Sequence, residues 1–287
     1  DAAIVLTGSA TVFIGATAAD IPALYAESYD GTSGLPVATG STNAVAIGRA
    51  YADGTDSFAA AIANNTSSYG ATGDESVAMG RFAKATGSRS IALGGNATAT
   101  ALFATALTNS YASGGDSFAA GMDSASASYG AQATSSIAIG KQAKATGAYG
   151  TAIGEATQAT ASNSVCMGYY SQATAQGAVA IGYDAQATAG KSYSFGLKVR
   201  NAIQNTFRFA GGHFSAAGDA QSGIYIMRSD TTDATAEALT TTKTAASTDN
   251  QVILPNNSAY FFSGTIIARQ QASAGTDVGA WEIKGAI

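Results

Sequence analysis

A short phrase of the form S-V-A-I-G recurs down this 287-residue chain, and its spacing constrains the fold more than any other feature. From Gly140 to Gly196 the glycines that close successive copies are 14 residues apart each time. A short fixed period is typical of a solenoid, in which each repeat forms one coil stacked on the last. The sequence therefore predicts an all-β solenoid with coils of about 14 residues. Copies end at Gly48, Gly80, Gly94, Gly121, Gly140, Gly154, Gly168, Gly182 and Gly196.

A longer repeat lies inside the first. Residues 51–100 align with residues 111–160 without a gap, at an offset of 60 residues, which indicates that a block of coils is duplicated. Both blocks contain one longer step of 19 residues, from Ala61 to Gly80 and from Gly121 to Gly140. The extra residues end at Tyr69 and Tyr129. Because insertions in solenoids form loops on one face, often the binding face, we expect these two tyrosines to contact a receptor.

Three segments follow from where the phrase is present. Residues 1–42 precede the regular repeats and contain two short apolar runs, so we expect strands or a cap there. Residues 43–199 are the predicted solenoid. Residues 200–287 lose the phrase but keep strand-like runs, around a stretch rich in Thr and Ala at 230–250 that is typical of a loop. We expect 200–287 to hold at least part of a non-repetitive β-domain.

The phrase has two uncharged faces. In residues 76–80 the period of two places Val77 and Met79 on one side, and Ser76 and Ala78 on the other. A strand without charge on either face is typically buried on both. A lone stack of coils covers only one face, so the second predicts contact with further copies of the chain. Small alanines suit close approach, and we expect the subunit seam on the alanine side. The seam candidates are Ala46, Ala78, Ala92, Ala138, Ala152, Cys166 and Ala180.

Composition excludes several classes of partner. The net charge is −5, and the 14 basic residues are scattered, so no nucleic-acid partner is expected. No apolar run is long enough to cross a membrane as a helix. A single Cys166 and a single His213 cannot form a disulfide framework or a metal site, and we expect no metal and no cofactor. Cys166 takes the place of an alanine, as a small buried side chain would.

The phrase S-V-A-I-G, followed by A-x-A-x-G at a 14-residue period, resembles the head repeats of trimeric autotransporter adhesins, over roughly residues 43–199. In that family the repeats form a left-handed parallel β-roll, and three rolls pack into a trimer, so the resemblance implies a homotrimer. It also implies that the large apolar residues fill the roll interior. These predicted core residues are Val45, Ile47, Val77, Met79, Ile91, Leu93, Ile137, Ile139, Val165, Met167, Val179 and Ile181.

Two departures from that family affect the expected function. We expect neither the heptad stalk nor the membrane anchor of that family, since no such pattern is recognised in the sequence. Its last segment, from DNQVILPNN to WEIKGAI, looks like the C-terminal part of structural proteins of tailed bacteriophages. We therefore expect an extracellular virion protein, a tail fibre that attaches to a glycan or protein of the host surface beside other virion proteins. The alternatives are the head of a bacterial surface adhesin and a head fibre or capsid decoration protein.

Catalysis is not expected. Glycoside hydrolysis, which phage tailspikes often perform, needs two carboxyl groups about 5–9 Å apart. Asp74 and Glu75 are adjacent in a turn, whereas Glu155, Asp184 and Asp219 are isolated in the sequence. A coil of about 14 residues also leaves little room for a catalytic groove. A polysaccharide-degrading tailspike thus stays a weaker alternative, which release of reducing sugar would reveal.

Overall fold

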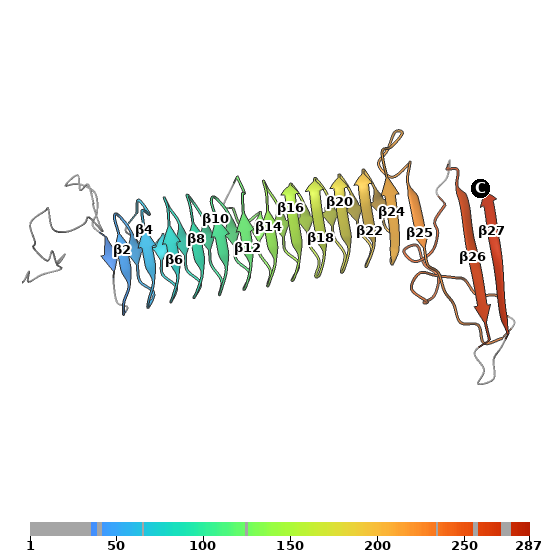
Figure 1. Cartoon of the computed structure of the whole chain (residues 1–287), viewed down its shortest axis with the longest axis horizontal. Helices are drawn as coiled ribbons and strands as arrows, with labels where there is room; N and C mark the ends of the chain where they lie inside the picture. The colour runs from blue at the N-terminus through green and yellow to red at the C-terminus, as the bar shows by residue number, and fades with distance from the viewer. Residues whose placement is uncertain are drawn as a thin grey trace, which may run out of the picture. The chain divides into compact units, whose positions relative to one another are not determined.

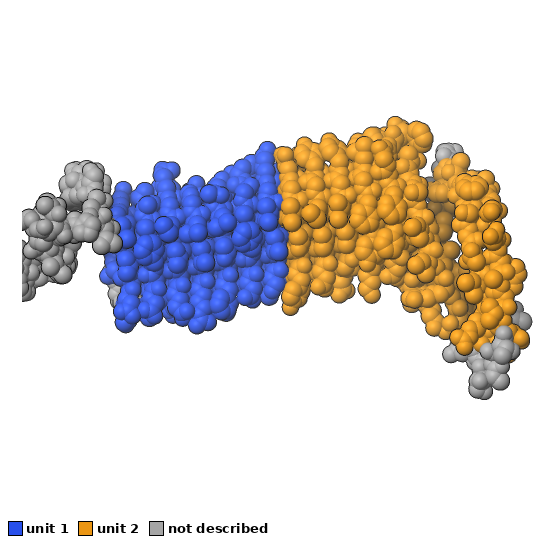
Figure 2. All heavy atoms as spheres, viewed as in Figure 1, with its two compact units in different colours: residues 1–142 blue, residues 143–287 orange. Residues whose placement is uncertain are grey.

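The computed structural model describes residues 36–38, 42–64, 66–123, 126–233, 235–254, 258–270 and 277–287. All regular elements in these ranges are strands (Figure 1). The chain divides into two compact units, residues 1–142 and residues 143–287 (Figure 2). In each unit every coil contributes one long and one short strand. The short, odd-numbered strands run from β1 to β23, so the chain forms a β-solenoid of about 12 turns, as the phrase predicts.

Unit 1 contains coils whose long strands are three residues each. These strands pair in parallel in the order β2-β4-β6-β8-β10-β12-β14, and the short strands in the order β1-β3-β5-β7-β9-β11-β13. The long strands are β2 (Val45–Ile47), β4 (Phe58–Ala60), β6 (Val77–Met79), β8 (Ile91–Leu93), β10 (Thr105–Leu107), β12 (Phe118–Ala120) and β14 (Ile137–Ile139). The short strands are β1 (Val37–Ala38), β3 (Tyr51–Ala52), β5 (Gly70–Ala71), β7 (Lys84–Ala85), β9 (Thr98–Ala99), β11 (Tyr111–Ala112) and β13 (Gly130–Ala131).

Unit 2 repeats the same coil with long strands of five residues. The long strands are β16 (Thr151–Glu155), β18 (Val165–Tyr169), β20 (Val179–Tyr183), β22 (Tyr193–Leu197) and β24 (Thr206–Ala210). The short strands are β15 (Lys144–Ala145), β17 (Gln158–Ala159), β19 (Gln172–Ala173), β21 (Gln186–Ala187) and β23 (Arg200–Asn201). Both ladders are parallel until β25 (Ser222–Tyr225), which pairs with β24 in the antiparallel direction. A separate antiparallel hairpin joins β26 (Phe261–Arg269) to β27 (Val278–Ala286).

The ladder includes strands on both sides of the segment predicted from the phrase. Val37 and Ala38, within the predicted cap, pair with Tyr51 and Ala52 of β3. The two apolar runs predicted as strands before them lie outside the described residues. At the other end β24 pairs with β22 although its sequence, TFRFA, lacks the phrase. Backbone pairing does not require the phrase, so coils continue where its residues are absent.

Alanine fills the interior of the coils. On the long strands Ala78, Ala92 and Ala152 are fully buried within a single chain. On the short strands Ala85 and Ala159 are also fully buried. The serine that begins most copies of the phrase adds a small polar side chain at the coil corner: Ser164 Oγ donates to the Ala161 carbonyl at 2.6 Å. The core is therefore a narrow stack of alanines closed by serine hydrogen bonds.

The closing glycine of the phrase is required by the stacking of coils. Gly154 has φ of +121°, and a Cβ on it would lie 1.9 Å from the carbonyl oxygen of Gly168 in the next coil. Side chains are disfavoured at positive φ, and no side chain fits at that distance. The glycine thus lets the backbones of neighbouring coils touch at the end of each long strand.

Candidate binding surface and subunit interface

The long strands present their large apolar residues outward, not inward. Val45, Met79 and Ile91 are 45%, 43% and 36% exposed, whereas Ala78 and Ala92 on the same strands as Met79 and Ile91 are fully buried. Val165 is in register with Val179 on the neighbouring strand, and Met167 with Ile181. These residues therefore form two columns along the outer face of unit 2. The outer columns in unit 1 are built in the same way from β2 to β14.

This arrangement shows that two predictions were wrong: which residues fill the inside of the coil, and which residues lie at the subunit seam. The predicted core residues Val45, Ile47, Val77, Met79, Ile91, Leu93, Ile137, Ile139, Val165, Met167, Val179 and Ile181 are all half-buried or exposed. Ala78, Ala92, Ala138, Ala152, Cys166 and Ala180, predicted at the seam, are fully buried inside the coil, and Ala46 in the first long strand is half-buried. The reason is space: two strands of one short coil lie too close together for branched side chains to fit between them.

Cys166 occupies the interior column as a small apolar residue. It replaces alanine in β18, beside Ala152 and Ala180 in the neighbouring strands. Burial raises the pKa of its thiol to about 12. The reactive form of cysteine is the thiolate, which is negligible at neutral pH with such a pKa. Cys166 is therefore a packing residue.

The two tyrosines predicted to contact a receptor are half-buried. The rings of Tyr69 and Phe82 contact each other at a tilt of 30°, with centroids 5.0 Å apart, and the Arg81 guanidinium lies 4.3 Å from the centroid of the Phe82 ring. The insertions that carry them are anchored by Ile62, fully buried, and Met122, 4% exposed. Tyr69 packs against residues of its own chain, so its position alone does not indicate that it contacts a receptor. For Tyr69 and Tyr129 receptor contact stays a prediction.

The most prominent aromatic surface lies in unit 2. Tyr169 and Tyr183 are in register at the ends of β18 and β20, and their rings stack with centroids 4.9 Å apart. Tyr170, the next residue in the chain, meets Tyr169 edge-on with centroids 4.4 Å apart. We call Tyr169, Tyr170 and Tyr183 the tyrosine cluster. The sequence contains a signal for it, because Tyr169 and Tyr183 are one coil length apart and must share a column.

The environment of the tyrosine cluster affects its titration. The pKa of Tyr169 is raised, first by partial burial and then by the nearby Tyr170, Glu155 and Tyr183. The Glu155 charge and the absence of water around part of the ring both disfavour a phenolate. The hydroxyl of Tyr169 thus stays protonated, and able to donate a hydrogen bond, throughout the physiological pH range.

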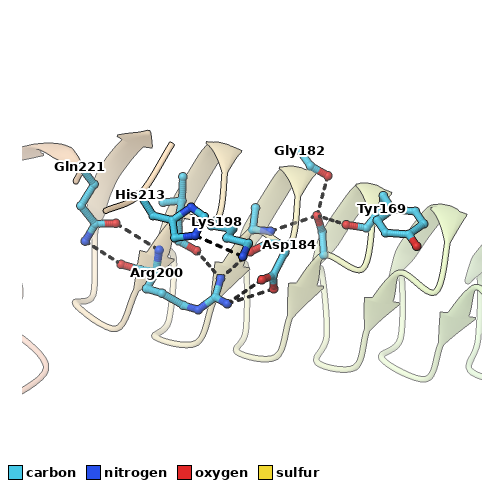
Figure 3. Close-up of polar contacts among 10 residues, drawn as sticks. Tyr169, Gly182, Asp184, Lys198, Arg200, His213 and Gln221 are labelled. Carbon is cyan, nitrogen blue, oxygen red and sulfur yellow. Dashed lines mark hydrogen bonds and ion pairs between the residues drawn. The ribbon is translucent and has the colours of Figure 1, made fainter. Parts of the chain in front are cut away.

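A polar network follows the cluster along the coil edge (Figure 3). The Arg200 Nη2 atom donates to both carboxylate oxygens of Asp184, at 3.0 and 2.9 Å, and Arg200 also donates to the Asp184 carbonyl. Gln221 holds the backbone of Arg200 on two sides: its Oε1 accepts from the Arg200 N–H, and its Nε2 donates to the Arg200 carbonyl, both at 3.1 Å. The side-chain amide of Gln221 thereby takes the place of a further strand at the end of the short-strand sheet.

The single histidine, His213, is exposed. The Nζ atom of Lys198 lies 3.4 Å from Nε2 of His213. Asp219 accepts hydrogen bonds from the backbone N–H groups of Phe214, Ser215 and Ala216 and so shapes the loop that carries His213. These contacts lower the pKa of Asp219. The carboxylate of Asp219 is occupied by these loop hydrogen bonds and is not available for acid–base chemistry.

A search of the described ranges finds no group of three or more His, Cys, Asp or Glu side chains that could hold a metal ion. In the same ranges there is no helix long and apolar enough to cross a bilayer. The remaining feature of note is therefore the surface itself, namely the outer apolar columns and the tyrosine cluster.

Comparison with known families agrees with this geometry. The model of the YadA head domain repeat (2 copies) matches residues 71–97, 85–107, 131–155, 145–171, 159–185 and 173–192. A comparison with curated proteins gave no match. Residues 71–107 and 131–192 of the solenoid are thus similar to a known adhesin head repeat. More particularly, the chain contains YadA head domain repeats, as the resemblance of its sequence implied.

Proposed function

We propose that this chain is a structural and adhesive fibre protein of a tailed bacteriophage particle and that it works as a homotrimer. The main support for the trimer is the apolar character of the outer face of the long strands. Its two columns expose large apolar side chains, among them Val45, Met79, Ile91, Ile137, Met167 and Phe209, while the chain's own interior buries mainly alanine. Contiguous exposed apolar surface of this kind typically marks an interaction site.

The proposed seam joins the outer columns of three copies. Burial of these side chains would supply the hydrophobic stabilisation that the alanine interior lacks, at about 25 cal/mol for each Å² removed from water. The columns repeat in every coil, so a self-complementary seam can run along the roll without a gap. YadA head repeats, which this chain contains, belong to proteins that assemble as trimers, and this supports the same state here.

The virion role is supported by the C-terminal segment that resembles tailed-phage structural proteins. In this role the roll is a stiff spacer: backbone ladders link every coil to the next, and the stacked coils leave few free strand edges. Its surface binds the host, and threefold repetition converts weak contacts into firm attachment. We infer no catalytic step.

A bacterial surface adhesin is the second candidate, favoured by the YadA head repeats themselves. Gold-labelled antibody against this chain distinguishes the candidates. Label on the tails of purified phage particles supports the proposal, label on the capsid supports a head fibre, and label on bacterial envelopes in cultures without phage supports the adhesin. Light scattering of the purified chain tests the oligomer separately: we expect three times the 28.4 kDa chain mass, and a folded monomer would contradict the seam.

A further inference from the structure

The tyrosine cluster is preorganised and accessible. Tyr170 and Tyr183 are 49% and 50% exposed, and Tyr169 is 37% exposed. Contacts among the three rings hold them in place, so a ligand that binds them need not pay for ordering loose side chains. The aromatic character is local. In the same two columns the preceding coil has Glu155 and Ala156, and the following coil has Leu197 and Lys198.

The position of the cluster in the coil argues that a subunit seam leaves it open. The cluster lies at the turn that follows the closing glycine of the phrase. At this same turn the coils of unit 1 take up their two insertions, after β4 and after β12. In unit 2 the loop that contains His213 also leaves the roll here, directly after β24. A seam across this turn would have to accommodate all three loops, which argues against a seam there.

The chemistry of the cluster fits a sugar. The negative face of an aromatic ring attracts the polarised C–H groups of a pyranose, and phenolic hydroxyls exchange hydrogen bonds with sugar hydroxyls. Three rings are too small a surface for a stable protein interface, which typically buries about 800 Å² on each partner. Glu155 acts electrostatically on Tyr169, and Asp184 is already paired with Arg200, so the cluster does not favour an anionic ligand.

We propose that the tyrosine cluster is a binding site for a neutral glycan, with one sugar ring on Tyr170 and the hydroxyls of Tyr169 and Tyr183 as hydrogen-bonding partners. This inference rests on the proposed attachment function and names its ligand class. Tyr170 carries the main contact because its ring is turned 64° from that of Tyr169 and is not stacked on a ring of a neighbouring coil. Three copies in a trimer would raise the avidity of a weak single site.

The test is a polysaccharide array probed with the purified full chain. The neutral arm holds dextran, mannan, galactan and β-glucan, and the acidic arm holds alginate and polygalacturonate. We expect retention on at least one neutral polymer, and Tyr170→Ala to weaken it about tenfold, the loss of one aromatic contact. Tyr170→Phe, which keeps the ring, should weaken binding less than Tyr170→Ala.

Tyr149→Ala is the matched control. Tyr149 is 60% exposed and, like Tyr170, has a positive φ, 58° against 53°. It should leave both binding and trimer mass unchanged. Retention on acidic polymers alone, no retention at all, or equal loss in both alanine variants would overturn the site. Loss of binding to host cells in Tyr170→Ala without any glycan binding would instead indicate a protein receptor and would also overturn it. A monomeric mass with intact glycan binding would contradict the trimer and leave the site standing.

Discussion

The two units contain the same type of coil, but the coil length varies in unit 1 and is constant in unit 2. In unit 2 the coil length is 14 residues without exception from Gly154 to Gly196, and the ladder extends through the glycine to the following residue, as in the pairs Gly154–Gly168 and Glu155–Tyr169. In unit 1 the insertions interrupt the spacing, and every long strand ends before the position of the closing glycine, which is Ala61 after β4 and Thr108 after β10. The long strands of unit 2 thus have two more paired residues than those of unit 1, and the second of these positions carries Tyr169 and Tyr183.

The largest expected effect concerns the insertions of unit 1. Ile62 is fully buried, and its carbonyl accepts from the Phe82 N–H at 2.7 Å. Ile62→Ala should lower the free energy of unfolding by about 2–5 kcal/mol, because it leaves a cavity under the inserted loop. Ser67→Ala, at an exposed position of the same insertion, is the control. Equal denaturation midpoints for the two variants would show that the insertion is not anchored.

The glycines that close the phrase allow a direct comparison of the units. A Cβ on Gly168 would lie 2.1 Å from the Gly182 carbonyl oxygen at φ of +115°, whereas Gly48 has φ of +70° and open space around it. Gly48→Ala should cost about 1–2 kcal/mol from backbone strain alone. Gly168→Ala should cost about 3 kcal/mol or more, because the next coil must also shift. Chemical denaturation measures both, and a larger loss at Gly48 would refute the tighter stacking of unit 2.

The ion pairs of the two units should also differ in their contribution to stability, but by a smaller amount. Arg200 and Asp184 are partly buried and joined by three hydrogen bonds, whereas Arg89 and Glu75 in unit 1 are about half exposed. Asp184→Asn should lower the melting temperature by about 2–4 °C. Glu75→Gln should leave it unchanged within error, since exposed pairs contribute little.

The exposed pair should nevertheless show a weak pH dependence. The hydrogen bond from Arg89 lowers the pKa of Glu75 below its ordinary value of 4.5. A lowered pKa in the folded state stabilises the fold above the unfolded value, and this contribution is lost as the pH falls through the folded value. Any difference between wild type and Glu75→Gln should therefore vanish on acidification below pH 4.5.

The sequence predicted the coil length, the strand positions and the turns, because these follow from backbone periodicity and from where glycine is required. It did not reveal which face is inside. Both faces of the phrase are uncharged, so polarity could not decide between them. The signal was side-chain size: from β2 to β22 the inner column holds only Ala, Cys and Ser, as in Ala152, Cys166 and Ser194, while the outer column varies from Thr151 to Tyr193. A narrow interior tolerates no such variation.

The tyrosine cluster was harder to single out from sequence. Tyrosine is frequent throughout the chain, and the insertions drew attention to Tyr69 and Tyr129. The fixed register places Tyr169 and Tyr183 in one column, but the edge-on contact of Tyr170 depends on a turn residue with positive φ, which residue spacing does not encode.

The account depends on alanines inside each coil and large apolar residues between chains, and one comparison tests it most directly. Light scattering and circular dichroism on two neighbouring variants, Ala180→Asp and Ile181→Asp, separate folding from assembly. We expect Ala180→Asp to unfold unit 2, because a buried unpaired carboxylate cannot be tolerated there. We expect Ile181→Asp to keep its β-sheet spectrum and fall below the trimer mass. An Ala180→Asp chain that stays folded and only dissociates, beside an Ile181→Asp chain that unfolds, would contradict the account.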